Sequence, residues 1–277
     1  SNTITGKDTN HMSQSSFGNK FKVTTWGESH GKALGAVIDG CPAGLPLCEE
    51  DIQKFLDRRK PGQSRYTTAR KEGDLVEILS GVFEGKTTGT PISLMVRNTD
   101  QRSRDYGNIA YSYRPGHADY TFDQKYGFRD YRGGGRSSGR ETIGRVAAGA
   151  IASKILEELG ISICTYTRSI GPVEIASFNK EEIHQNAFYM PDAQAAVKAG
   201  EYLEECMKNQ DSAGGVIECR ITGTPAGLGE PVFDKLSALL AHALMSIGAV
   251  KAVEIGDGIA VTSSNGSTDN DGFTVKD

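Results

Sequence analysis

The sequence predicts an α+β fold with sheet and helix layers in each of two related halves. Residues 21–26 alternate in polarity and are rich in β-branched and aromatic residues, which is typical of a strand. Residues 142–159 and 231–247 carry apolar residues at helical spacing. Gly-x-Pro-Ala-Gly-Leu occurs at 40–45 and again at 223–228, each time after a predicted strand and before a predicted helix. This repeat indicates two halves, although so short a similarity can also arise by chance.

The other elements follow in chain order. Strands are predicted at 34–40, 75–83, 91–96, 161–170 and 215–221, and helices at 49–60 and 191–209. A Gly/Thr turn between 75–83 and 91–96 indicates an antiparallel sheet. Residues 1–11 have no apolar periodicity and are expected to be a leader before a native start at Met12, so the main domain is expected at 12–262. The polar run 263–277 is expected to be mobile.

Composition limits the class of protein. The 277 residues are 37% hydrophobic with a net charge of −4 and a pI near 5.8, as in a soluble globular protein without bulk attraction to nucleic acid. No apolar run approaches the roughly 20 residues of a membrane span, and no signal pattern is seen, which predicts a cytoplasmic protein. The 5 cysteines are widely spread without Cys-x-x-Cys spacing, so we expect reduced thiols and no metal site.

One stretch, residues 114–145, concentrates positive charge. It contains the triple glycine 133–135, followed by Arg136, Ser137 and Ser138 and then a predicted helix. Such glycines allow several backbone N–H groups to converge, and serine hydroxyls add donors, so the stretch predicts a phosphate site. An ordinary loop with solvated arginines remains the alternative. Neither a dinucleotide pattern nor a Gly-Lys-Ser/Thr loop is present. The stretch holds six arginines: Arg114, Arg129, Arg132, Arg136, Arg140 and Arg145.

A second candidate is His30, which lies between glycines directly after the predicted strand 21–26. Loops of this kind allow close approach of a ligand and often carry catalytic groups, although a solvent-facing histidine in an ordinary turn is the alternative. Arg58 and Arg59 at the end of helix 49–60 favour the helix dipole. Arg65 and Arg70 lie beyond that helix in a Ser/Thr/Tyr-rich loop, which is typical of an anion-binding or lid segment.

Several of these motifs, in this order, resemble the chorismate synthase family. They are Gly-Glu-Ser-His-Gly at 27–31, Arg-Arg-Lys-Pro-Gly-Gln-Ser-Arg at 58–65, Arg-Pro-Gly-His-Ala-Asp at 114–119, Gly-Gly-Gly-Arg-Ser-Ser at 133–138, Pro-Ala-Gly-Leu-Gly-Glu-Pro-Val-Phe at 225–233, His-Ala-Leu-Met-Ser-Ile at 242–247 and Val-Glu-Ile-Gly-Asp-Gly at 253–258. The resemblance covers about residues 12–272.

The resemblance implies a fold and an activity. The fold would be a β-α-β sandwich, with helices between two antiparallel sheets. The activity would be the lyase reaction that converts 5-enolpyruvylshikimate-3-phosphate to chorismate, the last step of the shikimate pathway that supplies aromatic amino acid biosynthesis. Reduced FMN is needed without net redox change, and the family is typically homotetrameric. No motif tells whether NADPH or an external reductant reduces the flavin.

Roles for individual residues also follow from the resemblance. His30 matches the histidine that protonates the departing phosphate, and His117 matches the one that protonates the reduced flavin. An imidazole suits both tasks, since its ordinary pKa is about 6.5. The remaining matches are Arg59, Arg65 and Arg140 for substrate or NADP, and Arg136, Ser137, Ser138, Gly248 and Ala249 for FMN.

The chain departs from the family after residue 272. A glycine-rich flavin loop, a Lys-Pro-Thr segment and an Arg-His-Asp-Pro motif, whose aspartate works with the flavin in removing the ring proton, do not occur. We therefore expect this chain, as written, to bind FMN weakly or not at all and to lack turnover. A phosphate-binding or oligomerisation fragment without catalysis is the alternative from another class. A nucleoside-triphosphate enzyme and RNA binding through 114–145 are less favoured.

Overall fold

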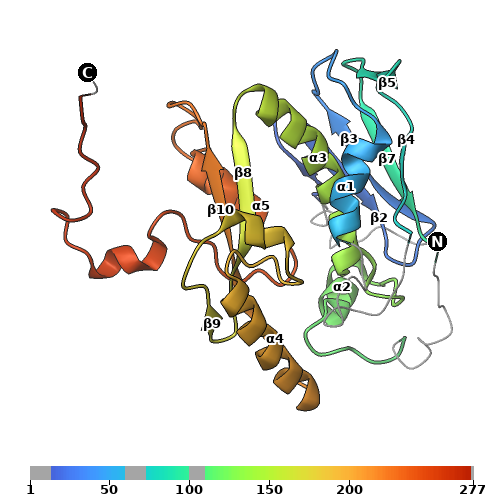
Figure 1. Ribbon diagram of the computed structural model, residues 1–277. Helices are drawn as coiled ribbons and strands as arrows, with labels where there is room; N and C mark the ends of the chain where they lie inside the picture. Colours follow the sequence, from blue (N-terminus) through green and yellow to red (C-terminus); the bar gives the residue numbers. More distant parts are fainter. Residues whose placement is uncertain (1–13, 60–72, 100–109, 276–277) are drawn as a thin grey trace. The chain divides into compact units, whose positions relative to one another are not determined.

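The computed structural model describes residues 14–59, 73–99 and 110–275. The chain forms two compact units, Ser1–Thr224 and Pro225–Asp277. Every strand pair in the described residues is antiparallel, and helices alternate with strands along the first unit (Figure 1). The predicted α+β class is confirmed.

The first sheet has the strand order β1-β2-β3-β7-β4. Its strands are β1 (Ser16–Phe17), β2 (Lys22–Gly27), β3 (Ala33–Asp39), β7 (Ile92–Arg97) and β4 (Val76–Ile78). In β7, Ile92, Leu94 and Val96 are buried and alternate with more exposed residues, so one face of the sheet carries the core. The predicted strand 75–83 is two short strands, β4 and β5 (Val82–Phe83), and β5 pairs with β6 (Lys86–Thr87).

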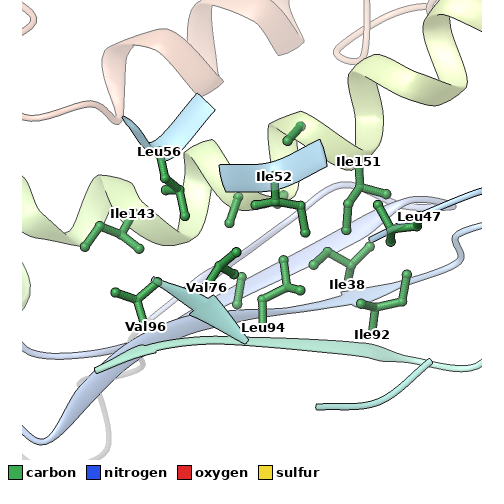
Figure 2. Close-up of a cluster of buried hydrophobic side chains, with 14 of the residues drawn as sticks. Ile38, Leu47, Ile52, Leu56, Val76, Ile92, Leu94, Val96, Ile143 and Ile151 are labelled. Atoms are coloured by element: carbon green, nitrogen blue, oxygen red, sulfur yellow. The ribbon is translucent and has the colours of Figure 1, made fainter. Parts of the chain in front are cut away.

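Two helices cover this face of the sheet. Figure 2 shows Ile52 and Leu56 of α1 (Glu49–Arg59) and Ile143 and Ile151 of α3 (Thr142–Glu158) facing the strands. All four side chains are at most 1% exposed. Burying a side chain of this size fully contributes about 1.5–3 kcal/mol, so this layer holds the first unit together.

A close contact between two glycines places the start of α3. A Cβ added to Gly144 would lie 2.8 Å from the carbonyl oxygen of Gly35 in β3, and one added to Gly35 would lie 2.0 Å from the oxygen of Leu94. Only glycine allows α3 to approach the sheet so closely. The segment before α3 therefore lies at the end of β2, where the candidate site is found.

The second sheet has the order β10-β8-β9, formed by β10 (Gly215–Thr222), β8 (Ser162–Ile170) and β9 (Val173–Glu174). α4 (Ala193–Lys208) packs on β9, and Asp192 caps the helix by accepting from Gln194 N and Ala195 N, both at 3.0 Å. α3 contacts β2, β3 and β7 and also β8. It thus lies between two antiparallel sheets, as the family resemblance implies.

The sequence repeat is also a repeat of local structure. Gly40 and Gly44 after β3 have φ of 82° and 87°, and Gly223 and Gly227 after β10 have φ of 81° and 88°. α1 follows the first turn, and α5 (Leu236–Met245) follows the second. The second unit contains α5 and the 3₁₀ helix η6 (Gly258–Ser263). In the described part of the chain, no helix combines the length and hydropathy needed to span a membrane.

Candidate functional site

The His30 loop joins β2 to β3. The side chain of Asn98, the residue directly after β7, fixes this loop. Asn98 Nδ2 donates to the carbonyl oxygens of Glu28 at 3.0 Å and Gly31 at 2.7 Å. Ser29 and His30 are 1% and 5% exposed, so the solvent-facing histidine considered for this loop is not what the structure shows. The short loop, held at both ends, gives His30 a defined position.

The imidazole of His30 lies against the triple glycine. A Cβ added to Gly133 would lie 2.1 Å from both Cε1 and Nδ1 of His30. Ser29 Oγ donates to Gly133 O at 3.2 Å and is 3.1 Å from His30 Nδ1. Because the single hydroxyl proton is used on the carbonyl, Ser29 Oγ accepts from Nδ1–H. Nε2 is then the ring nitrogen that gains and loses the proton.

His117 lies in the loop before α2 (Asp119–Tyr126), a helix that the sequence pattern did not reveal. The side chain is exposed, and its Nδ1 donates to Pro115 O at 3.1 Å. Arg114 clamps this loop by donating to Asp119 through its backbone N, Nε and Nη2 at 3.0, 2.9 and 2.8 Å. These bonds hold the pKa of Asp119 far below its usual range, so the carboxylate stays charged.

The triple glycine contacts both the loop that carries His30 and the loop that carries His117. Gly133 meets His30, while a Cβ on Gly134 would lie 3.8 Å from Arg114 Nη2, in the His117 loop. The three glycines have φ of 59°, 85° and 55°, a run that residues with a Cβ adopt only at a cost. The glycine stretch therefore touches His30 itself and Arg114 at the start of the loop that carries His117.

The Arg136 side chain is bonded to the end of β2. Its guanidinium donates to Thr25 Oγ1 at 2.7 Å, Gly27 O at 3.2 Å and Thr25 O at 3.3 Å, and so ties the glycine stretch to the end of β2. Ser137 is exposed and its hydroxyl donates to Gly134 O at 2.7 Å. Ser138 Oγ accepts from Arg140 N at 3.3 Å and caps the 3₁₀ turn η4 (Gly139–Glu141).

The positive charge predicted for 114–145 is partly balanced by carboxylates in the folded chain. Five of the six arginines form ion pairs with a carboxylate, and Arg136 binds backbone and hydroxyl oxygens. The pairs form because the partner acids lie within reach in the folded chain, so most of the charge is already neutralised. The pairs are Arg114–Asp119, Arg129–Asp123, Arg132–Asp130, Arg140–Asp74 and Arg145–Glu141.

Arg59 and Arg140 share a single carboxylate, that of Asp74. Asp74, whose side chain is 0% exposed, accepts from Arg140 Nη1 at 2.8 Å and from Arg59 Nη1 at 3.1 Å. Arg140 Nε donates to Asn98 Oδ1 at 2.7 Å, and Asn98 holds the His30 loop. Burial lowers the pKa of Arg59 and Asp74 opposes the shift, but a guanidinium stays protonated. Among the described residues, these three side chains sum to a formal charge of +1 beside the His30 loop.

The other predicted residues lie elsewhere. Arg65 falls outside the described residues. Gly248 and Ala249 belong to the second unit, shortly after α5, where Ala249 has a φ of 68°. Sequence reasoning did not identify Asp74 and Asn98, whose only signals were an acid after Gly73 and a polar residue at a strand end. Within the described residues, no group of three or more His, Cys, Asp or Glu side chains could hold a metal ion.

The glycine stretch suits part of a flavin phosphate site but not all of it. Gly134 and Gly135 are buried, and the exposed Ser137 hydroxyl gives its proton to Gly134 O, so an anionic group would meet Ser137 by exchanging that bond or Ser138, whose Oγ accepts from Arg140 N. The Arg136 guanidinium is already bonded to β2. Of the predicted FMN residues in this stretch, Ser137 and Ser138 fit a direct contact, and Arg136 fits a bracing role.

The fold and the site define an α+β protein in which two histidine loops meet at a glycine-rich turn beside paired arginines. Comparison with known proteins gives the particular family. The family model described as chorismate synthase matches residues 21–277. The chain is 68% identical over 268 residues to chorismate synthase of Agathobacter rectalis, covering 96% of this chain and 73% of that protein. It is 67% identical over 264 residues to chorismate synthase of Lachnoclostridium phytofermentans, covering 95% and 72%.

A solved structure agrees. The crystal structure of a chorismate synthase superimposes with a TM-score of 0.78 at 34% identity, covering 92% of this chain and 74% of that one. The chain therefore belongs to the chorismate synthase family, lyases of the shikimate pathway that supplies aromatic amino acid biosynthesis.

Proposed function

We propose that the protein converts 5-enolpyruvylshikimate-3-phosphate to chorismate by 1,4-anti elimination of phosphate and a ring proton, with reduced FMN and without net redox change. The observation that carries the proposal is the buried His30, whose Nδ1 is held by Ser29 and whose ring lies against Gly133. The family relationship supports the same reaction.

His30 would act as the general acid. With Nδ1–H bonded to Ser29, the imidazolium gives its second proton from Nε2 to the bridging oxygen as the carbon–oxygen bond breaks and phosphate leaves. A positioned acid of this kind contributes roughly 10²- to 10⁴-fold in rate. The Arg59–Asp74–Arg140 cluster, whose three side chains sum to a formal charge of +1, would attract the carboxylates and phosphate of the substrate, and Arg65 would join it.

His117 and the serines would serve the cofactor side. The exposed imidazole of His117, fixed through Pro115 O, would hold a proton toward the reduced flavin. Ser137 and Ser138, with Gly248 and Ala249, would contact FMN, while Arg136 keeps the glycine stretch in place. Bound FMN would supply reducing power that is returned within the cycle.

An assay of chorismate formation tests the proposal. The 277-residue chain and a fusion completed by the unaligned part of the Agathobacter rectalis relative would each be given substrate and reduced FMN. We expect no turnover from the chain and turnover from the fusion. In the fusion, His30→Gln should lower kcat by at least 100-fold. Lys22→Gln, exposed on the same strand that leads to the His30 loop, is the control and should not change kcat.

The outcomes separate the alternatives. Unchanged kcat in the His30→Gln fusion would remove His30 from the chemistry. Substrate binding by a chain that never turns over would favour the phosphate-binding fragment for that polypeptide. We further propose a cytoplasmic homotetramer, which light scattering on the purified fusion would test by its mass.

A further inference from the structure

A cavity lies beside the C-terminal end of α1. Its volume is about 430 Å³, within the range of pockets that bind small molecules. The end of α1, the middle of α3, strand β8 and the 3₁₀ helix η5 (Lys180–His184) form its walls, and we call it the β8 cavity. Arg59 of the Asp74 cluster is among its lining residues, whereas His30, His117, Arg136, Ser137 and Ser138 are not.

The walls of the β8 cavity are basic. Arg58, Arg59, Lys180 and His184 line it, and no acidic side chain does so among the described residues. Arg59 shares the Asp74 carboxylate with Arg140. Within the described chain, Arg58 and Lys180 have no carboxylate within ion-pair distance, so these two side chains bring uncompensated positive charge to the cavity, and His184 adds a ring N–H donor. An anion would find three donors of different geometry there.

The same walls offer an aromatic surface. Arg58 Cζ lies 5.6 Å from the ring centroid of Tyr189, and the His184 ring meets that ring edge-on at 6.1 Å. Tyr189 has a φ of 56°, a left-handed conformation that is uncommon for a bulky residue. Asn186 Oδ1 holds this turn by accepting from Phe188 N at 3.1 Å and Met190 N at 3.2 Å. Tyr189 is thus a fixed wall rather than a mobile surface ring.

Part of the cavity wall is apolar. Phe55, Val146, Ile163 and Ile183 also face the β8 cavity. A bare inorganic anion would leave these side chains uncovered, whereas a neutral ring would leave three basic groups without a partner. A ligand with both an aromatic or cyclic body and a carboxylate satisfies both surfaces.

We propose that the β8 cavity is a binding site for a small ring-bearing carboxylate outside the His30 loop, sharing Arg59 with the substrate-binding cluster proposed above. The ring lies on Tyr189 and the apolar wall, and the carboxylate meets Arg58 and Lys180, with His184 at the edge. The proposal is independent of the proposed reaction, because it needs neither turnover nor FMN.

Calorimetric titration of the 277-residue chain tests it with two probes of the same shape. 1-Naphthoate should bind with a stoichiometry near one, and its neutral analogue 1-naphthamide should bind at least about 10-fold more weakly, since it cannot use the basic groups. Inorganic phosphate should also bind at least about 10-fold more weakly than 1-naphthoate, because it has no ring. Equal affinity for naphthoate and naphthamide, or no binding, would overturn the proposal.

Variants locate the site. Arg58→Gln and Lys180→Gln should each raise the Kd of 1-naphthoate by about 5- to 10-fold. Lys180 is exposed, so Lys180→Gln keeps the test valid even if Arg58→Gln fails to fold. Lys198→Gln, an exposed lysine on α4 outside the lining, should leave Kd unchanged, as should His30→Gln. If His30→Gln weakens binding as much as Arg58→Gln does, the probe occupies the His30 site and the proposal fails.

Discussion

Gly133 leaves no room for a side chain beside His30, because an added Cβ would stand 2.1 Å from the imidazole Nδ1. The glycine stretch therefore forms one wall of the place where the histidine lies. Since Ser29 bonds both His30 Nδ1 and Gly133 O, the ring and the glycine are fixed by the same hydroxyl.

The first prediction concerns this wall. Gly133→Ala should displace the His30 ring and lower kcat in the fusion protein by at least 100-fold, because a general acid works only when it is positioned. Gly139→Ala is the matched control in the same segment, since nothing lies within 4 Å of its added Cβ and its φ is not left-handed. Equal kcat values in the two variants would contradict the proposed packing. The His30 Cε1–H resonance reports the displacement directly.

The second prediction concerns the acid shared by two arginines. Asp74→Asn keeps the shape of the side chain and tolerates the φ of 40° at this position, but it removes the negative charge that Arg59 and Arg140 share. Breaking a buried ion pair from one side costs roughly 3–5 kcal/mol, so urea unfolding should show a loss of that order. Glu77→Gln removes the exposed pair with Arg97 and should cost less than about 1 kcal/mol. Similar losses in both variants would mean that the Asp74 cluster is not stabilising.

The third prediction compares two glycines of α3. Gly144→Ala should destabilise the protein by about 1–2 kcal/mol, because the new Cβ would press on Gly35 O at 2.8 Å. Gly149→Ala should stabilise it by about 0.5–1 kcal/mol, because that position has open space and alanine is the better helix former. Urea unfolding of both variants measures the difference. A stabilising Gly144→Ala would show that α3 does not need to approach the sheet this closely.

Much of the fold could be predicted because local patterns specify it. α3 and β8 begin within one residue of the predicted positions, since apolar periodicity marks both. α2 was missed because its only buried residue is Asp119, which is held by ion pairs instead of an apolar stripe. The predicted helix at 231–247 begins only at Leu236, because Glu230 and Asp234 form an isolated bridge in a turn first.

The site was predictable in its residue types but not in its pairings. The histidine that lies between glycines, and the serines that follow an arginine, can be recognised from the sequence alone. The partner of Arg140 is 66 residues away, and that of Arg136 in β2 is 111 residues away, so only the fold reveals which guanidinium groups are already bound. A count of arginines along a segment therefore overestimates the charge offered to a ligand.

The last prediction concerns stability in acid. Asp192 accepts from the backbone N–H groups of Ala195 and Ala176, among others, and these bonds lower its pKa from 3.8 to about 2. A carboxyl with a lowered folded pKa contributes stability that is present above about pH 4 and is lost as pH falls through about 2. Wild type should therefore exceed Asp192→Asn by about 1 kcal/mol at pH 6, and the gap should close towards pH 2.

Urea unfolding at several pH values between 2 and 6 measures this gap, and the difference between the two proteins removes the effect of other carboxyl groups. Asp192→Ala separates charge from capping. It removes the acceptor itself and should be less stable than wild type by about 1–2 kcal/mol at pH 6. Because protonated Asp192 still accepts hydrogen bonds, this variant should stay less stable at pH 2 as well. A gap between wild type and Asp192→Asn that does not change with pH would show that Asp192 does not titrate in this range.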